Sequence, residues 1–194
     1  AKVETHLTMG NHDNREVFYE VLREQRQAMP PVKSRHVAVV ETKYANLFLL
    51  DSLQQTMVTP GTLGPEQLAW LAAALDARQD KPALIVAHHN PRFGGDPIHY
   101  PGGLTDSQEL WEVLVKRPQV KAYVHGHVHD REYSQHQGIH ILNLPAVSFV
   151  ADPVKSANGW TIAYLSPEGM TLETRTHKPD HPWNGQKTKI TWRT

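Results

Sequence analysis

The sequence contains no cysteine, no excess of either charge and no long apolar run. Without cysteine there are no disulfide bonds and no thiolate metal sites, so histidine, asparagine, aspartate or glutamate must hold any metal ion. The redox compartment is left open. Lysine and arginine together number 20, and so do aspartate and glutamate, so no long-range field attracts a polyanion. Nucleic acid is therefore not expected as a partner, and small substrates are favoured.

No stretch of the chain approaches the ~18 consecutive apolar residues that a membrane-spanning helix needs, so no membrane partner is expected. The first residues lack the charged and then apolar order of a signal peptide. Residues upstream of Ala1 can exist in the natural protein, so this absence leaves export and localisation unknown. The 194 residues suit a single domain with a core of its own.

Short apolar runs alternate with amphipathic stretches, which is the pattern of a layered α/β domain. A hairpin turn is expected at Gln137-Gly138, between a strand at 133–135 and the next one. The other expected strands are 3–9, 36–40, 47–50, 83–87, 120–124, 139–142, 160–165, 171–176 and 188–192.

Three helices are expected between the early strands. The first should begin at Asp13, whose carboxylate can cap backbone amides while Glu16 reaches back three residues later. Its buried stripe is expected to consist of Val17, Val21 and Leu22.

The second helix is expected to start at Pro65, a residue suited to the first helical position. The third should open with a capping box over 105–108 and stop before Pro118. The apolar faces are predicted from spacing. They comprise Leu68, Leu71, Ala72 and Leu75 in the second helix, and Leu110, Val113 and Leu114 in the third.

Three polar motifs each follow an apolar strand. They are Gly10-Asn11-His12-Asp13, His88-His89 and Gly126-His127-Val128-His129. Taken alone, they can be a turn with a helix cap, polar residues where a strand emerges, and two histidines on one face of a strand end. Their shared position at the carboxyl ends of strands predicts that they converge, because open α/β folds place their sites there. Neutral imidazoles and an amide oxygen are suitable ligands for a divalent ion.

In this order and spacing, the motifs resemble those of the calcineurin-like metallophosphoesterases, which include purple acid phosphatases and class III cyclic-nucleotide phosphodiesterases. The Gly-Asn-His-Asp/Glu motif of that superfamily stands here at 10–13, its strand-following histidine at 88–91, and its Gly-His-x-His at 126–129. Residues 63–75 resemble the phosphodiesterase branch, so the resemblance extends over about 3–152.

The resemblance implies an α/β (α+β) fold, a four-layer αββα sandwich of the metallo-dependent phosphatase type, lacking its N-terminal strands. One domain over 1–194 is expected, with the motif-bearing core at about 3–152 and terminal strands and a loop at 153–194. In this superfamily the unmatched segment supplies strands to the middle of a sheet. We therefore expect a homodimer through the exposed edge, or an associated N-terminal segment.

For the metal site, the resemblance implies that Asn11, His88 and His127 are ligands of the second metal and that His129 is a ligand of the first. His88 is preferred because the ligand usually follows the strand directly. An alignment on His-x-Pro would favour His89 instead.

For catalysis, the resemblance implies that His12 protonates the leaving group or steadies the phosphoryl oxygens, with Asp13 orienting it. Arg92, His99 and Tyr100 lie in a loop rich in glycine and proline, where a substrate rim or lid is expected, although such residues are more often solvated loop.

The opening Asp-x-His and the Gly-Asp motif of the superfamily have no match in this sequence. The complete site holds two divalent ions, Mn, Fe or Zn, and fewer or none are expected in this chain alone. The implied function is hydrolysis of phosphomonoesters or small phosphodiesters by a metal-bridging hydroxide, incomplete here. The alternative is a non-catalytic remnant or interaction module that keeps the fold and at most one metal.

Overall fold

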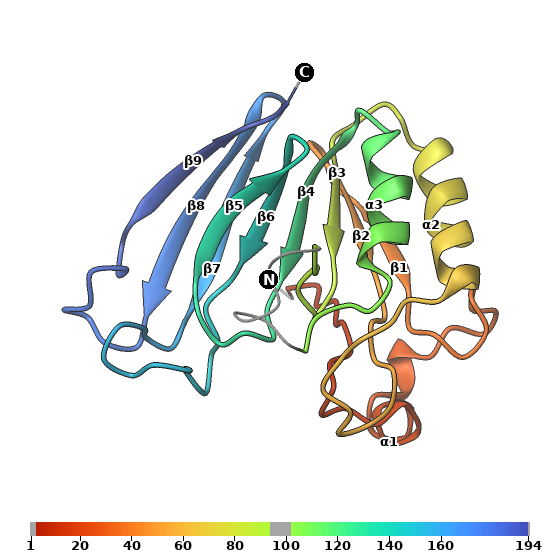
Figure 1. Ribbon diagram of the computed structural model, residues 1–194, viewed down its shortest axis with the longest axis horizontal. Helices are drawn as coiled ribbons and strands as arrows, with labels where there is room; N and C mark the ends of the chain where they lie inside the picture. The colour runs from red at the N-terminus through yellow and green to blue at the C-terminus, as the bar shows by residue number, and fades with distance from the viewer. Residues whose placement is uncertain (1–2, 94–101, 194) are drawn as a thin grey trace.

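The computed structural model describes residues 3–93 and 102–193. Its centre is a six-stranded sheet in the order β1-β2-β3-β4-β6-β5 (Figure 1). The strands are β1 (Ala38–Glu41), β2 (Asn46–Leu49), β3 (Ala83–Val86), β4 (Val120–His125), β5 (Glu132–His136) and β6 (Ile139–Asn143). From β2 to β6 the neighbours run parallel, and β1 and β5 join the two edges antiparallel. The carboxyl ends of β2, β3 and β4 therefore meet at one edge of the sheet.

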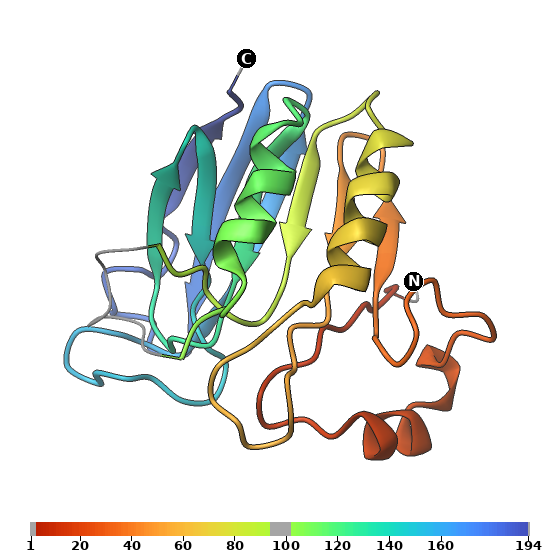
Figure 2. The same ribbon diagram turned by 45° about the vertical axis from the view of Figure 1, so that its right-hand side comes forward.

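Two helices cover one face of this sheet, as Figure 2 shows. They are α2 (Pro65–Asp76) and α3 (Ser107–Val115). Their apolar sides, including Leu71 and Leu110, pack against Phe48, Ile85 and Tyr123 of the strands, all fully buried. Burial of this kind is the main stabilising contribution to the fold.

A second, antiparallel sheet of three strands packs on the opposite face. It consists of β7 (Gly159–Ser166), β8 (Gly169–Thr176) and β9 (Lys187–Thr191), in the order β7-β8-β9. Met170 and Leu172 of β8 meet Leu84, Ala122 and Leu142 of the large sheet. Since both faces of β3 are covered, this strand is apolar at every position.

These layers agree with the predicted α/β sandwich. In the described parts of the chain they number three: a helical layer, the six-stranded sheet and the three-stranded sheet. The second helical layer of the expected four-layer sandwich is not among the described residues. No helix in the described ranges combines the length and the apolar character that crossing a bilayer requires.

The prediction of a strand at 3–9 is wrong. These residues belong to no strand, and Val3 is 82% exposed. An extended segment becomes a strand only when a neighbour pairs with its backbone, and no described strand pairs with residues 3–9. The remaining expected strands are confirmed with shifts of one or two residues at their ends, and the turn at Gln137-Gly138 has the positive φ angles of a tight hairpin.

The expected start of the first helix is also wrong. Helix α1 (Arg15–Val21) is capped by Asn14, whose side chain accepts hydrogen bonds from the amides of Glu16 and Val17. It has no buried residue, and Val17 and Val21 are exposed. A short 3-10 helix, η1 (Arg23–Gln25), follows.

The capping box expected for the third helix does not form. Asp106 occupies the N-cap position without capping, and its carboxylate instead accepts hydrogen bonds from the amides of Leu63 and Gly64. The hydroxyl of Thr105 donates to Gly61 O. Long-range partners thus replace the local ones that the spacing suggested.

Candidate metal centre

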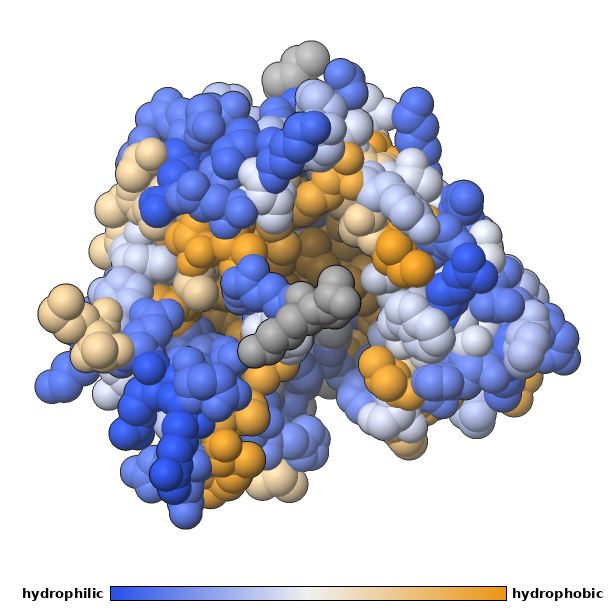
Figure 3. Space-filling view, turned by 180° about the vertical axis from the view of Figure 1, so that it is seen from behind, coloured by the Kyte–Doolittle hydropathy of each residue, from blue (hydrophilic) through white to orange (hydrophobic). Residues whose placement is uncertain are grey.

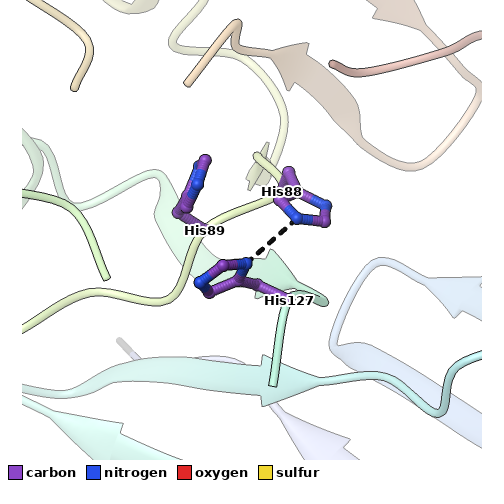
Figure 4. Close-up of side chains that lie close together, drawn as sticks. All are labelled: His88, His89 and His127. Carbon is purple, nitrogen blue, oxygen red and sulfur yellow. Dashed lines mark hydrogen bonds between the residues drawn. The ribbon is translucent and has the colours of Figure 1, made fainter. Parts of the chain in front are cut away.

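Three side chains converge beyond the carboxyl ends of β3 and β4. His88 Nε2 lies 3.1 Å from Asn11 Oδ1 and 3.1 Å from His127 Nδ1. Figure 4 shows the rings of His88 and His127 turned toward each other. The register explains the encounter, because Val86 pairs with Val124 and the two chains leave the sheet side by side. A third segment brings Asn11 to the same point.

Glycine at position 10 permits this approach. A Cβ atom there would lie 2.7 Å from Cγ and Nδ1 of His88, which is closer than real side chains come. The next residue is held in place by its backbone, since Met57 N donates to Asn11 O at 2.6 Å. The Gly-Asn pair in the motif therefore has a packing reason as well as a chemical one.

The neighbouring His89 is fully buried and has both ring nitrogens engaged. Nδ1 lies 2.8 Å from Ser52 Oγ, and Nε2 lies 3.1 Å from Thr59 O. Because the carbonyl can only accept, Nε2 carries the proton and Nδ1 accepts from the serine hydroxyl. Gly61 leaves room for this ring, since a Cβ there would lie 2.4 Å from Nδ1. Of the two adjacent histidines, the geometry therefore favours His88 as a ligand.

Burial favours the neutral form of His88, His89 and His127. Desolvation, with smaller effects from neighbouring histidines, lowers the pKa of His88 to about 4 and that of His89 to about 3. Desolvation also lowers the pKa of His127, and the backbone of Gly102 offsets this in part. A neutral imidazole has a lone pair available for a cation, so these groups are ligand-competent at pH 7.

His127 and His129 lie in the turn after β4 rather than on a strand end. Both have positive φ angles, 67° and 59°, which non-glycine residues rarely adopt. His129 joins His88 and His127 in the wall of a cavity of about 340 Å³. Its Nδ1 is buried with no hydrogen-bond partner among the described residues. Strained backbone of this type is concentrated at functional sites.

The two residues expected to act in catalysis lie on the motif turn and are exposed. Asp13 Oδ2 accepts a hydrogen bond from Gly10 N at 2.7 Å, and Thr56 Oγ1 donates to Asp13 O at 2.7 Å. His12 is close enough for its charge to lower the pKa of His88 and His127. Within the described ranges, no hydrogen bond joins Asp13 to His12, so its orienting role stays a prediction.

The residues expected at a substrate rim are placed only in part. Arg92 is exposed and lines a different cavity of about 210 Å³, beside Asn90 and His125. His99 and Tyr100 lie outside the described residues.

Some residues of this region had no role in the sequence analysis. His125 borders both the 210 Å³ and the 340 Å³ cavities, and burial lowers its pKa to about 4. Its position two residues before His127 was the available signal. The hydroxyl of Ser52, which holds His89, follows β2 and had no motif context.

The donor set fits a divalent cation. Two ligand atoms that each lie about 2.1 Å from one metal ion, at a right angle to each other, are about 3 Å apart. His88 Nε2 lies 3.1 Å from Asn11 Oδ1 and 3.1 Å from His127 Nδ1, so both distances suit ligands of one ion. His88, His89 and His127 each offer a nitrogen within a 4.8 Å group. No carboxylate belongs to this group among the described residues.

Known proteins share both the sequence and the fold. The family model "Calcineurin-like phosphoesterase" matches residues 1–131. The 3',5'-cyclic adenosine monophosphate phosphodiesterase CpdA of Vibrio vulnificus is 32% identical over 137 residues, which cover 71% of this chain and 47% of that protein. The Escherichia coli K12 protein of the same name is 30% identical over 87% of this chain and 61% of its own length. The chain thus spans about half the length of these relatives.

Among solved structures, a dimetal phosphatase from Danio rerio superposes with a TM-score of 0.75 at 18% identity, covering 97% of this chain and 72% of the other. The structure of PhoD gives a TM-score of 0.59 at 13% identity, over 91% of this chain and 45% of the other. These similarities establish the sandwich fold of the metallo-dependent phosphatases. The match to the family model, over more than half of the sequence, shows that the chain belongs to the calcineurin-like phosphoesterase family.

Proposed function

We propose that this chain forms part of a metal-dependent phosphodiesterase that hydrolyses small phosphodiesters, with 3',5'-cyclic nucleotides as the leading substrate class. The observation that carries the proposal is the convergence of Asn11, His88 and His127, with donor atoms 3.1 Å apart. The names of the CpdA relatives support the substrate class.

We assign Asn11, His88 and His127 to one cation and His129 to a second. His89 is assigned a positioning role, because Ser52 and Thr59 O hold its ring against the ligand cluster. Bound divalent ions would activate water and neutralise charge on the phosphate. Manganese, iron and zinc all accept nitrogen and oxygen donors of this kind.

The exposed His12 is proposed to give a proton to the leaving oxygen of the substrate. Its place on the turn beside Asn11, in reach of the ligand cluster, supports this role. A general acid must approach the oxygen within hydrogen-bond distance, and an exposed imidazole on a turn can do so.

A second candidate is a non-catalytic member of the family that holds at most one ion. The composition of the ligand group favours it, since the described residues contribute histidines and no carboxylate. A single site of neutral ligands binds a cation less strongly than a pair of sites joined by carboxylates. It also lacks the second charge that acidifies a shared water.

Metal-dependent turnover tests the proposal. The chain is stripped with EDTA and reloaded separately with Mn²⁺, Fe²⁺ or Zn²⁺. Hydrolysis of 3',5'-cyclic AMP and of bis(4-nitrophenyl) phosphate is then followed while bound metal is counted by mass spectrometry. We expect turnover to fall by roughly 10²-fold or more when metal is removed, because positioned positive charge supplies several kcal/mol to such reactions.

The stripped protein is its own control, with circular dichroism confirming that the fold persists. Equal turnover with and without EDTA would contradict the metal-dependent mechanism. A folded chain that holds one ion or none and hydrolyses neither compound would favour the non-catalytic alternative.

We also propose that a second copy of the chain adds to the free edge of β7. Of the four sheet edges described, β7 alone has no charged side chain, whereas β9 carries Lys187 and Lys189. Trp160, Ile162 and Tyr164 of β7 are exposed. Figure 3 shows a hollow lined by apolar side chains in the middle of the face turned away from α2 and α3. An uncharged, apolar edge strand favours pairing with another strand.

A charge at this edge is expected to separate the copies. In sedimentation, we expect the wild type to form dimers and Ile162→Lys to raise the dissociation constant at least about tenfold, since a lysine on an edge strand opposes pairing with another strand. Thr191→Lys on the opposite edge is the matched control and should leave the dimer intact. A wild type that remains monomeric at high concentration would refute the arrangement.

A further inference from the structure

A cavity of about 660 Å³ lies apart from the histidine cluster, between α1, the 26–35 segment and the 51–57 loop. Its volume falls within the ~300–1,000 Å³ of small-molecule sites. In Figure 1 these segments lie at the lower right, around the label α1. None of its lining residues belongs to the group of possible metal ligands.

Positive charge dominates the wall of this cavity. Three arginines line it, Arg15, Arg26 and Arg35, against a single acidic residue, Glu16. Asp51 lies behind the wall, fully buried, and forms a two-bonded ion pair with Arg15 at 2.7 and 2.9 Å. One of the three guanidinium charges is thus neutralised from behind, and two face the cavity without an equivalent partner.

Arg35 has only main-chain partners among the described residues. Its Nη1 donates to the carbonyl oxygens of Leu53 at 2.8 Å, Thr62 at 3.3 Å and Asp51 at 3.4 Å. Burial lowers the pKa of Arg35 from its usual range, and the carboxylates of Asp51, Asp106 and Glu66 offset this only in part. A half-buried guanidinium with incomplete compensation gains stability from an anion placed against it.

Arg26 is the second of these two guanidinium groups in the cavity wall. Its guanidinium lies over the ring of Tyr19, 5.1 Å from the ring centre, and forms no ion pair with a described carboxylate. Stacking on the ring fixes the plane of the guanidinium and leaves its edge free to donate. Planar guanidinium groups recognise phosphate oxygens through paired hydrogen bonds.

We propose that this cavity is a binding site for a small phosphorylated anion, held between the guanidiniums of Arg26 and Arg35. The hydroxyl of Ser34 and the side chain of Gln27 also line the cavity and can hydrogen-bond to the rest of the ligand. A phosphate monoester fits the charge and the volume. The cavity contains none of the residues assigned to the metal ions, and binding there needs no metal ion.

Calorimetric titration in EDTA tests this site independently of hydrolysis. Inorganic phosphate and adenosine 5'-monophosphate are the two probes. We expect one saturable site whose affinity weakens as salt is added, because the contacts are ionic and partly exposed. Arg26→Gln should weaken binding at least tenfold without unfolding the chain, since Arg26 is exposed. Arg35→Gln should weaken binding by a larger factor.

Arg23→Gln is the matched control, because Arg23 is an exposed arginine three residues away that does not line the cavity. Equal affinity for both probes would mean that the phosphate group alone is recognised, and tighter binding of the nucleotide would mean that its organic part is also held. No saturable binding, or unchanged binding in Arg26→Gln, would overturn the proposal. Since metal is absent throughout, failure of the hydrolytic proposal would leave this result unaffected.

Discussion

Replacing His88 by alanine is expected to abolish metal binding and metal-dependent turnover, whereas replacing His89 should only weaken them. His88 Nε2 lies at the centre of the ligand cluster, 3.1 Å from both Asn11 Oδ1 and His127 Nδ1. The nitrogens of His89 already face Ser52 Oγ and Thr59 O. Loss of a residue that only orients ligands costs about 10–100-fold in metal affinity, and loss of a ligand costs more.

Isothermal titration calorimetry of each purified variant with Mn²⁺ or Zn²⁺ measures this difference in metal affinity. His177→Ala is the matched control, because His177 is an exposed histidine outside the 340 Å³ cavity. The reverse order, with His89→Ala losing metal and His88→Ala retaining it, would establish His89 as the ligand. Equal retention by both would exclude the cluster as a metal centre.

Asp51→Asn is expected to lower the stability of the fold strongly, although the two side chains have nearly the same shape. The carboxylate is fully buried, and besides pairing with Arg15 it accepts hydrogen bonds from the amides of His36 at 2.9 Å and Leu53 at 3.1 Å. Removing one partner of a buried ion pair costs about 3–5 kcal/mol, because the remaining charge is left unpaired. For a domain of this size that corresponds to a fall in Tm of roughly 6 to 20 °C.

Thermal unfolding followed by circular dichroism gives this shift directly. Asp152→Asn is the control, since Asp152 pairs with Lys155 on the surface at 3.6 Å and should leave Tm unchanged. If Asp51→Asn unfolded at the wild-type temperature, the Asp51 network would not stabilise the fold.

The elements that the sequence predicted well are helices with one buried apolar side and strands that are buried on both faces. Leu71 and Leu75 recur at helical spacing and lie fully buried in α2, and the apolar run of β3 is covered on both sides. Local pattern and tertiary burial agree there, so the pattern is a reliable guide. The turn at Gln137-Gly138 could also be predicted, because a glycine in a two-residue hairpin turn allows the positive φ angle that the turn needs.

The errors fall where a local rule competes with a distant partner. Residues 3–9 have strand-like composition, but no described strand pairs with their backbone. At α3, Asp106 bonds to the 63–64 backbone and Thr105 to Gly61, so neither completes the expected cap. Neither partner can be foreseen from spacing, because each lies more than 40 residues away along the chain.

By itself the sequence determined the donor types, the order of the three motifs and their position after strands, because these depend on residue identity and on local apolar patterns. Only the tertiary structure decided that Asn11, His88 and His127 meet within 3.1 Å, and that Ser52 and Thr59 engage His89. Only it brought Arg26 and Arg35 to one cavity. Such distances depend on how parallel strands end and on which loops pack together, and those are properties of the whole fold.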